Sequence, residues 1–210
     1  MIRLHFRSAT LSAALLVSPA VQAWSQDHPV TQAGLLTEAL AGQTVASLPL
    51  TMVTRDTAIH DPALDRDRKQ VLAWADSLIG EALLAGAPEI NWLLSPDLRR
   101  IARRSAGFVP EPDRMGQAVM RSPELKTVPD PLRSSLRTLM ALAGGRFAFI
   151  PASLSIGVDE DGAIRATLEA VLADSRLGRV SWRTTAIGSG ADAGAAIAAA
   201  VESFLPYAQP

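Results

Sequence analysis

The residues of this 210-residue chain that could carry chemistry are few. There is no cysteine, which excludes thiol catalysis, thiolate zinc sites and iron–sulfur clusters. No G-x-S-x-G motif is present, so no serine has the sequence context of a hydrolase nucleophile. A serine, a histidine and a carboxylate that meet only in the folded chain stay open as an alternative. We therefore predict no catalytic residue, with a non-motif hydrolase as the second hypothesis.

One histidine, His60, lies in an acidic stretch. Histidine together with carboxylates could bind a divalent metal ion. The chain has only three histidines, one of them in the N-terminal 23 residues, so a multi-histidine zinc site is not expected. Carboxylates that precede a helix are also stabilised by its dipole, and we predict a solvated acidic loop without a metal. The acidic residues of this stretch are Asp56, Asp61, Asp65 and Asp67.

The segment Gly188–Ala193 (GSGADA) matches the dinucleotide pattern G-x-G-x-x-A, after a predicted strand and before a predicted helix. Such a motif binds phosphate through backbone N–H groups at the start of a helix. The following strand and the acidic residue about 20 positions further on, which the nucleotide-binding fold requires, are not expected here. We predict an ordinary strand-to-helix connection and no cofactor.

Arginines are concentrated in one predicted helix, residues 97–105, which carries Arg99, Arg100, Arg103 and Arg104. Spacings of three and four place Arg100, Arg103 and Arg104 on one face. Guanidinium groups on one face suit an acidic partner, a phosphate or a lipid head group. The alternative is an ordinary solvated helix face. We predict these three arginines as partner-binding residues.

Three tryptophans, Trp74, Trp92 and Trp182, fall inside predicted helices and strands. The simplest interpretation is that they belong to the core, because each lies in an apolar pattern. A platform for a carbohydrate or a peptide is the alternative.

The N-terminus has the layout of a secretory signal peptide. Arg3 and Arg7 precede an apolar run over residues 9–17, and the small-residue site Val21–Ala23 follows. The run is far shorter than the roughly 20 residues that span a bilayer. We predict a signal peptide over residues 1–23 and a periplasmic or secreted protein. Without a cysteine there is no lipid-acceptor site of the bacterial lipoprotein kind.

The charge balance excludes two classes of partner. Removal of the two leader arginines leaves 18 basic and 21 acidic side chains, a formal charge of −3. Such a chain has no basic field for nucleic acid and no polybasic anchor for anionic lipid. We expect neither nucleic-acid binding nor stable membrane insertion.

The elements that must position these residues follow from hydrophobic periodicity. A lead-in over residues 24–43 precedes them, and an irregular segment over residues 107–131, with five prolines, interrupts them. We predict strands over residues 44–53, 90–94, 146–156, 163–173 and 179–187, and helices over residues 65–85, 97–105, 132–143 and 191–204.

This order indicates a two-layer α/β (α+β) sandwich. Short turns near Asp159–Gly162 and Ser175–Gly178 predict that the last three strands form an antiparallel meander. We expect a mixed sheet of about five strands with helices packed on one face, in a single domain over residues 44–210. Alanines in the last helix would allow it to lie close to the sheet.

Two segments of this pattern resemble a known family. The segment from Gly145 is similar to its "G-x-R-F/Y-V" strand, and the following hairpin is similar to its "D-x-x-T-G-x-V-x-W" hairpin, although Leu177 replaces the usual threonine. The family is the periplasmic domain shared by the CsgG-like curli-secretion subunit, the lipoprotein activators of penicillin-binding proteins and the Tol-protein N-terminal domain. The matching residues are Gly145, Arg146, Phe147, Asp174, Gly178, Val180 and Trp182.

The resemblance implies a cell-envelope module that binds other envelope proteins. We therefore predict a secreted, non-catalytic accessory or binding module whose contact surfaces are the arginine helix and the segment 107–131. A structural subunit of an envelope assembly is a further alternative, and the oligomeric state is left open.

Overall fold

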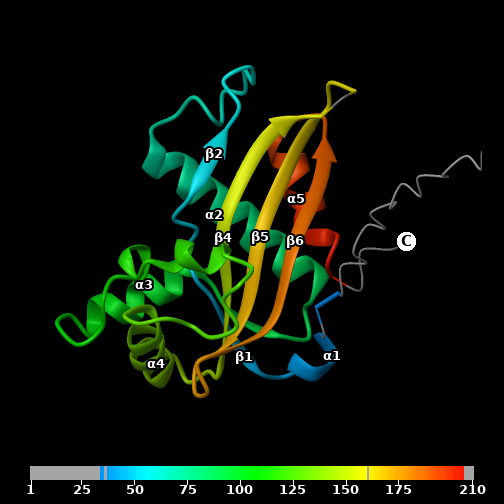
Figure 1. Ribbon diagram of the computed structural model, residues 1–210. Coiled ribbons are helices and arrows are strands. Elements are labelled where there is room, and N and C mark those ends of the chain that lie inside the picture. Colours follow the sequence, from blue (N-terminus) through cyan, green and yellow to red (C-terminus); the bar gives the residue numbers. More distant parts are fainter. Residues whose placement is uncertain (1–33, 36, 160, 206–210) are drawn as a thin grey trace, which may run out of the picture. The chain divides into compact units, whose positions relative to one another are not determined.

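The computed structural model describes residues 34–35, 37–159 and 161–205. A mixed six-stranded sheet forms its centre, in the order β3-β1-β4-β5-β6, with β2 also paired to β4 (Figure 1). The predicted leader, residues 1–23, lies outside the described residues, and the predicted boundaries at 23 and 43 stay predictions. The strands are β1 (Thr44–Ser47), β2 (Val53–Arg55), β3 (Asn91–Leu93), β4 (Phe147–Val158), β5 (Ile164–Asp174) and β6 (Arg179–Gly190).

Helices pack against this sheet, and the predicted α+β class is confirmed. Each main helix falls close to its predicted range, because apolar residues recur at helical spacing there. The helices are α1 (Thr37–Leu40), α2 (Arg68–Gly86), α3 (Ser95–Arg104), α4 (Leu132–Ala143) and α5 (Ala193–Glu202), with 3-10 turns η1 (Pro112–Arg114) and η2 (Gln117–Arg121).

The strands β4, β5 and β6 form the predicted antiparallel meander. Phe147 pairs with Asp174 at one end of the first hairpin, and Val158 pairs with Ile164 at the other. The short strands differ, because β1 is parallel to both β3 and β4, and β2 is parallel to β4. The sheet is therefore mixed, with the long antiparallel strands on one side.

The strand predicted over residues 44–53 is in fact two strands, β1 and β2, that lie along β4 one after the other. Pro49 lies in the break, because proline lacks the N–H that a strand interior needs. Its carbonyl oxygen accepts a hydrogen bond from Gln117 Nε2 at 2.9 Å. The N–H of Leu50 turns to a carboxylate oxygen of Asp76 at 2.6 Å.

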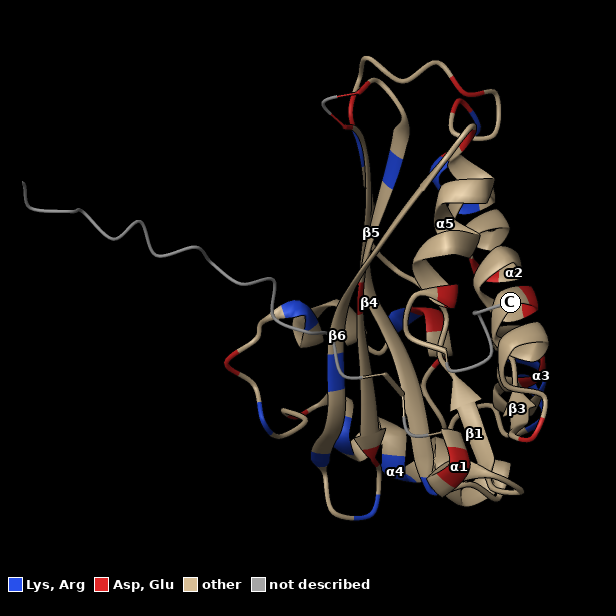
Figure 2. Ribbon diagram, turned by 90° about the vertical axis from the view of Figure 1, so that its right-hand side faces the viewer, with Lys and Arg blue, Asp and Glu red and all other residues tan. Residues whose placement is uncertain are grey.

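Helices α2 and α5 lie side by side over one face of the sheet (Figure 2). The approach of α5 to β6 is close enough to require glycine on the strand. A Cβ at Gly188 would lie 2.1 Å from the backbone nitrogen of Ala200, and one at Gly190 would lie 2.6 Å from that of Ala196. The alanines of α5 therefore act as predicted, by letting the helix lie against the sheet.

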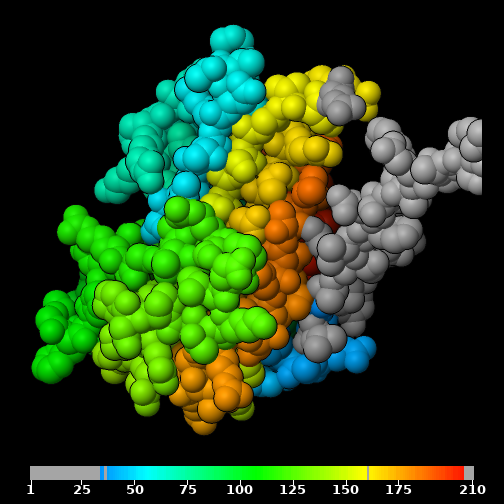
Figure 3. All heavy atoms as spheres, viewed as in Figure 1, coloured from blue at the N-terminus to red at the C-terminus, as the bar shows by residue number. Residues whose placement is uncertain are grey.

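A second core lies on the opposite face of the sheet, where the sequence did not indicate helices. Successive residues of a strand point to opposite faces, so Phe149 joins the α2–α5 core while Ile150 joins the second one. Helix α4 and the segment 107–131 cover this face over the lower part of the strands, while their upper parts stay visible (Figure 3). The buried side chains that the segment contributes are Val109, Met115, Met120 and Val128.

Candidate docking groove

A groove of about 1290 Å³ lies between α2 on one side and α3 with the chain after it on the other. Leu72 and Ala73 of α2, and Ala102 and Val109 on the opposite side, give it apolar walls. Charged side chains surround these walls, five basic and two acidic. The groove therefore offers apolar contact and charge in one place.

Local sequence signals position both walls. Asp67 caps α2, because its carboxylate accepts a hydrogen bond from the N–H of Gln70 at 3.0 Å. Ser95 is the first residue of α3, and Leu94 is its N-cap residue. The Ser95 hydroxyl donates a hydrogen bond to the Ser47 carbonyl oxygen at 3.4 Å. After α3, Gly107 adopts a left-handed φ of +87°, which glycine tolerates, and the chain turns back.

A charge network extends from the lining of the groove to a buried carboxylate beneath it. Nη2 of Arg99 donates to Asp76 at 3.0 Å and to Asp113 at 2.7 Å, and its Nε donates to Asp113 at 2.9 Å. The side chain of Asp76 is only 6% exposed and also accepts the N–H of Leu50. The network therefore joins α2, α3, η1 and the break between β1 and β2.

The network shifts the pKa values of its members in different directions. Burial raises the pKa of Asp76 to about 6, although the hydrogen bond from Leu50 and the charge of Arg99 oppose it. Hydrogen bonds from Arg99 lower the pKa of the more exposed Asp113. The same contact with Asp113 raises the pKa of Arg99, which stays charged.

The remaining charges leave the groove net positive. Arg114 pairs with Glu111 at 3.5 Å, and Arg68 donates to the Thr51 carbonyl at 2.9 Å. Within the described residues, Lys69 and Arg103 form no ion pair, although the charge of Lys69 adds to the hydrogen bonds from Arg99 that lower the pKa of Asp113. Even with the carboxylate of Asp76 included, the basic groups of the groove outnumber the acidic ones.

The three arginines predicted to bind a partner are all exposed, but only Arg103 lines the groove. Arg100 pairs with Asp97 at 2.8 Å along α3. Arg104 faces solvent outside the groove. Arg99 was not among the predicted partner-binding residues, although it lies four positions before Arg103 and also lines the groove. The partner-binding role of the three stays a prediction.

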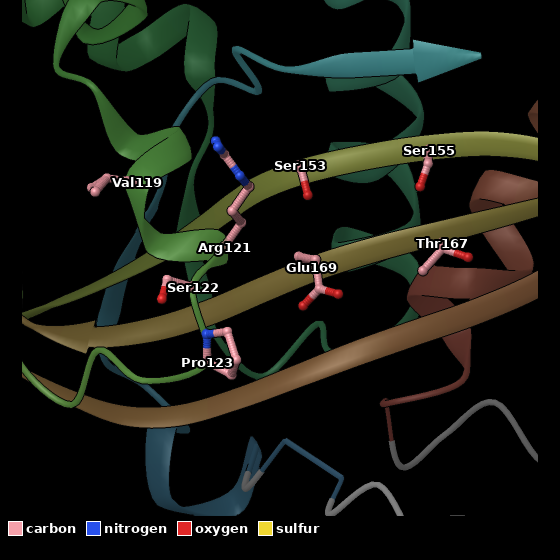
Figure 4. A pocket seen from close by; sticks show the side chains of 8 residues that line it. All are labelled: Val119, Arg121, Ser122, Pro123, Ser153, Ser155, Thr167 and Glu169. Carbon is pink, nitrogen blue, oxygen red and sulfur yellow. The ribbon is translucent and has the colours of Figure 1, made fainter.

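A second hollow, of about 540 Å³, lies on the open face of the sheet (Figure 4). Ser153 of β4 and Glu169 of β5 line it, with Arg121 from η2 at its side. The Glu169 carboxylate accepts a hydrogen bond from the Thr185 hydroxyl at 2.9 Å. The guanidinium of Arg121 points away from Glu169, and His60 does not line the hollow. The hollow thus has a serine and a carboxylate in its lining and no histidine beside them.

The acidic residues around His60 accept hydrogen bonds within the fold, and Asp61 reaches a distant partner, the N–H of Ala193, at 3.1 Å. Asp56 accepts the N–H of Ala58, Asp65 pairs with Arg55, and Asp67 is the cap of α2. No group of three histidine or acidic side chains placed to hold a metal occurs among the described residues.

The glycine pattern of Gly188–Ala193 has a packing role. The sides of Gly188 and Gly190 where a Cβ would lie are filled by α5. Asp192 caps α5 by accepting the N–H of Ala195 at 2.7 Å. Both glycines lie within β6, opposite Ala166 and Ile164 of β5.

The tryptophans and the hairpin motif also stabilise the fold. Trp92 packs edge-on against Phe149, and Trp182 packs against Phe204, at centroid distances of 6.1 and 5.3 Å. Arg146 forms an ion pair with Asp174, whose other carboxylate oxygen accepts the next backbone N–H groups of the turn. The motif that carries the family resemblance is thus a turn-and-core motif.

None of the helices in the described ranges is long and apolar enough to cross a lipid bilayer. A scan against protein-family models and a search of curated proteins find no match to this chain.

A search of solved structures finds matches at low sequence identity. The C-terminal domain of LpoB from Salmonella enterica is 10% identical, with a TM-score of 0.39, and the match covers 71% of this chain and 83% of that one. LpoB of Escherichia coli is 11% identical, with a TM-score of 0.37 over 90% and 82%. PelC from Paraburkholderia phytofirmans, a dodecamer, is 14% identical, with a TM-score of 0.37 over 83% and 94%.

LpoB is a penicillin-binding-protein activator, so one of the three groups named from the sequence appears among these structures. The CsgG-like and Tol-like resemblances stay predictions. At these TM-scores and identities the likenesses carry no argument about what this chain does.

Proposed function

We propose that this protein is a secreted, non-catalytic accessory module of the bacterial cell envelope that binds another envelope protein through the groove between α2 and α3. The observation that carries the proposal is the groove itself, with apolar walls and five basic side chains, among them Lys69 and Arg103, which form no ion pair among the described residues. Both features suit protein contact, because interfaces combine an apolar centre with arginine-rich polar contacts.

The absence of assembled catalytic groups supports the non-catalytic part of the proposal. Among the described residues, His60 is the only histidine, and it lines neither the groove nor the sheet-face hollow. The signal-peptide pattern of residues 1–23 supports export, and the lack of a cysteine supports a protein without a lipid anchor.

The test is affinity capture of the tagged protein from cross-linked cells, with mass spectrometry and a tag-only control. Changing Arg100, Arg103 and Arg104 together to Glu is expected to abolish capture of the envelope partner. A matched triple change of Arg137, Arg165 and Arg176 to Glu, exposed arginines elsewhere on the surface, is expected to leave capture intact. Unchanged capture by the first variant would remove this surface from the proposal.

Thermal stability must be measured on both triple variants. A negative charge in the last turn of α3 opposes the helix dipole, which costs about 0.5 kcal/mol per residue. The corresponding glutamine triple avoids this cost and should also lose capture. Light scattering over a range of concentrations separates a monomeric module from a subunit of an envelope assembly.

A further inference from the structure

One large apolar side chain is far more exposed than the others. Phe108 is 83% exposed, whereas the other large exposed apolar residues of the described chain lie between 43% and 55%. The chain after α3, where Phe108 lies, extends away from the sheet at the left of Figure 1. Its two neighbours, Gly107 and Val109, both line the groove. Phe108 itself is not among the groove-lining residues, so its exposed ring belongs to the chain segment that borders the groove.

The charges beside Phe108 select the sign of a partner. Arg103 and Lys69 line the groove, one from each wall, and neither forms an ion pair among the described residues, although Lys69 lies close enough to Asp113 for its charge to help lower the pKa of that carboxyl. The acidic residues of the groove, Glu111 and Asp113, are paired with Arg114 and Arg99. With five basic and two acidic side chains in its lining, the groove presents net positive charge to a partner, and a basic segment would be repelled.

The size and shape of the groove favour a polypeptide segment. Pockets for small ligands measure about 300–1,000 Å³, and this groove exceeds that range at about 1290 Å³. Its basic groups lie on facing walls of a concave surface, which a flat bilayer cannot enter. A segment of chain can lie between the walls and reach both charges.

We infer that the groove, together with Phe108 beside it, binds an acidic segment of a partner protein. Carboxylates of the segment contact Lys69 and Arg103, and an apolar side chain of the segment packs on the ring of Phe108. The inference rests on the proposed binding function and adds the chemistry of the partner. Aromatic and arginine side chains in such positions commonly contribute most of the binding energy.

The experiment places the photo-reactive residue benzoylphenylalanine at position 108 of the exported protein in living cells. The same residue at Leu142, an exposed position on α4, is the control. Mass spectrometry then identifies the cross-linked peptide. The expected result is a stretch with several aspartates or glutamates and at least one apolar residue, cross-linked from position 108 and not from 142.

Synthetic copies of that stretch give the quantitative test. Binding to the purified protein, measured by fluorescence anisotropy, should weaken about tenfold in Phe108→Ala and in Arg103→Glu. Replacing the acidic residues of the peptide with amides should have the same effect, and added salt should weaken binding. Leu84→Ala, an exposed apolar change on α2, should leave it unchanged.

Three outcomes would overturn the inference: a neutral or basic cross-linked stretch, a cross-link to phospholipid, or no cross-link above the control. These outcomes leave the proposed function separately testable. If the tagged protein still captures an envelope protein while position 108 cross-links nothing, the binding module stands and its surface is elsewhere. If no envelope protein is captured at all, the proposed function fails.

Discussion

Asp174, in the turn between β5 and β6, and Asp76, under the groove, are both buried carboxylates that bind an arginine, yet their pKa values shift in opposite directions. Burial raises the pKa of each. At Asp174, hydrogen bonds from Arg146 and from the N–H groups of Leu177 and Arg176 outweigh burial. Asp76 accepts one backbone N–H and shares Arg99 with Asp113, so burial prevails there.

The packing around the two carboxylates also differs. The meander lies so close to α5 that a Cβ at Gly188 has no room, while the groove between α2 and α3 stays open. Asp174 accepts two N–H groups from its own turn besides the guanidinium of Arg146, 28 positions away, whereas both donors of Asp76 are distant, at 23 and 26 positions. The meander is thus a densely packed scaffold, and the groove is an open site held by distant contacts.

The largest expected effect tests the close packing of the meander. Gly188→Ala places a methyl group against backbone atoms of α5, which cannot move without separating the helix from the sheet. We expect the free energy of unfolding to fall by about 3 kcal/mol or more. Urea denaturation measures it, and Gly157→Ala on β4, where a Cβ meets open space, is the control with little expected change. Equal effects of the two changes would contradict the close approach of α5.

The next effect concerns the pH dependence of stability at Asp76. The pKa of this group is raised from 3.8 to about 6, so between these pH values the folded protein binds a proton more tightly than the unfolded chain. The contribution of Asp76 to the free energy of unfolding therefore falls as the pH rises from about 4 to about 6. The expected fall is about 2–3 kcal/mol, because each unit of pKa shift corresponds to about 1.4 kcal/mol. Asp76→Asn removes this fall.

The measurement is the free energy of unfolding at pH 4.5, 5.5 and 7 for the wild type and Asp76→Asn. Carboxylates with lowered pKa values, such as Asp174, lose stability toward acid in both proteins and cancel in the difference. If the difference between the two proteins does not change with pH, the raised pKa of Asp76 is wrong.

A smaller loss is expected when the carboxylate of the turn is neutralised. Asp174→Asn keeps the shape of the side chain but weakens its hydrogen bonds to Arg146 and to the turn N–H groups. We expect a loss of about 2 kcal/mol at pH 7, because charged hydrogen bonds of a buried carboxylate are involved. Thermal unfolding should show this loss shrinking as pH falls below about 4. A loss that is the same at every pH would point to packing instead.

The smallest effect tests the outer half of the groove network. Asp113 is 44% exposed, and exposed ion pairs contribute little. Asp113→Asn should lower the free energy of unfolding by only about 0.5 kcal/mol. It should also make Arg99 available to an acidic partner, so the peptide affinity defined above should rise slightly. A large stability loss would mean that η1 depends on this contact.

Sequence alone determined the parts of this protein whose signals are local. Alternating apolar residues predicted the two long hairpins, and helical spacing predicted the ranges of α2 and α4. The alanines predicted the close approach of α5 to the sheet. These predictions succeed because hydrophobic periodicity and turn formation depend on residues that are close together in the sequence. The break of the first predicted strand at Pro49 was not predicted, because the apolar and β-branched residues on both sides of the proline form one continuous pattern.

Only the tertiary structure decided the groove. The segment 107–131 has no sustained period, so nothing local indicated that Met115 and Met120 would be buried on the second face of the sheet. The spacing predicts Arg103 as a partner-binding residue, but its place opposite Lys69 in the groove, and the burial of Asp76 beneath Arg99, depend on contacts between residues far apart in the chain. Such contacts form when α2, α3 and η1 pack together, and no local pattern encodes them.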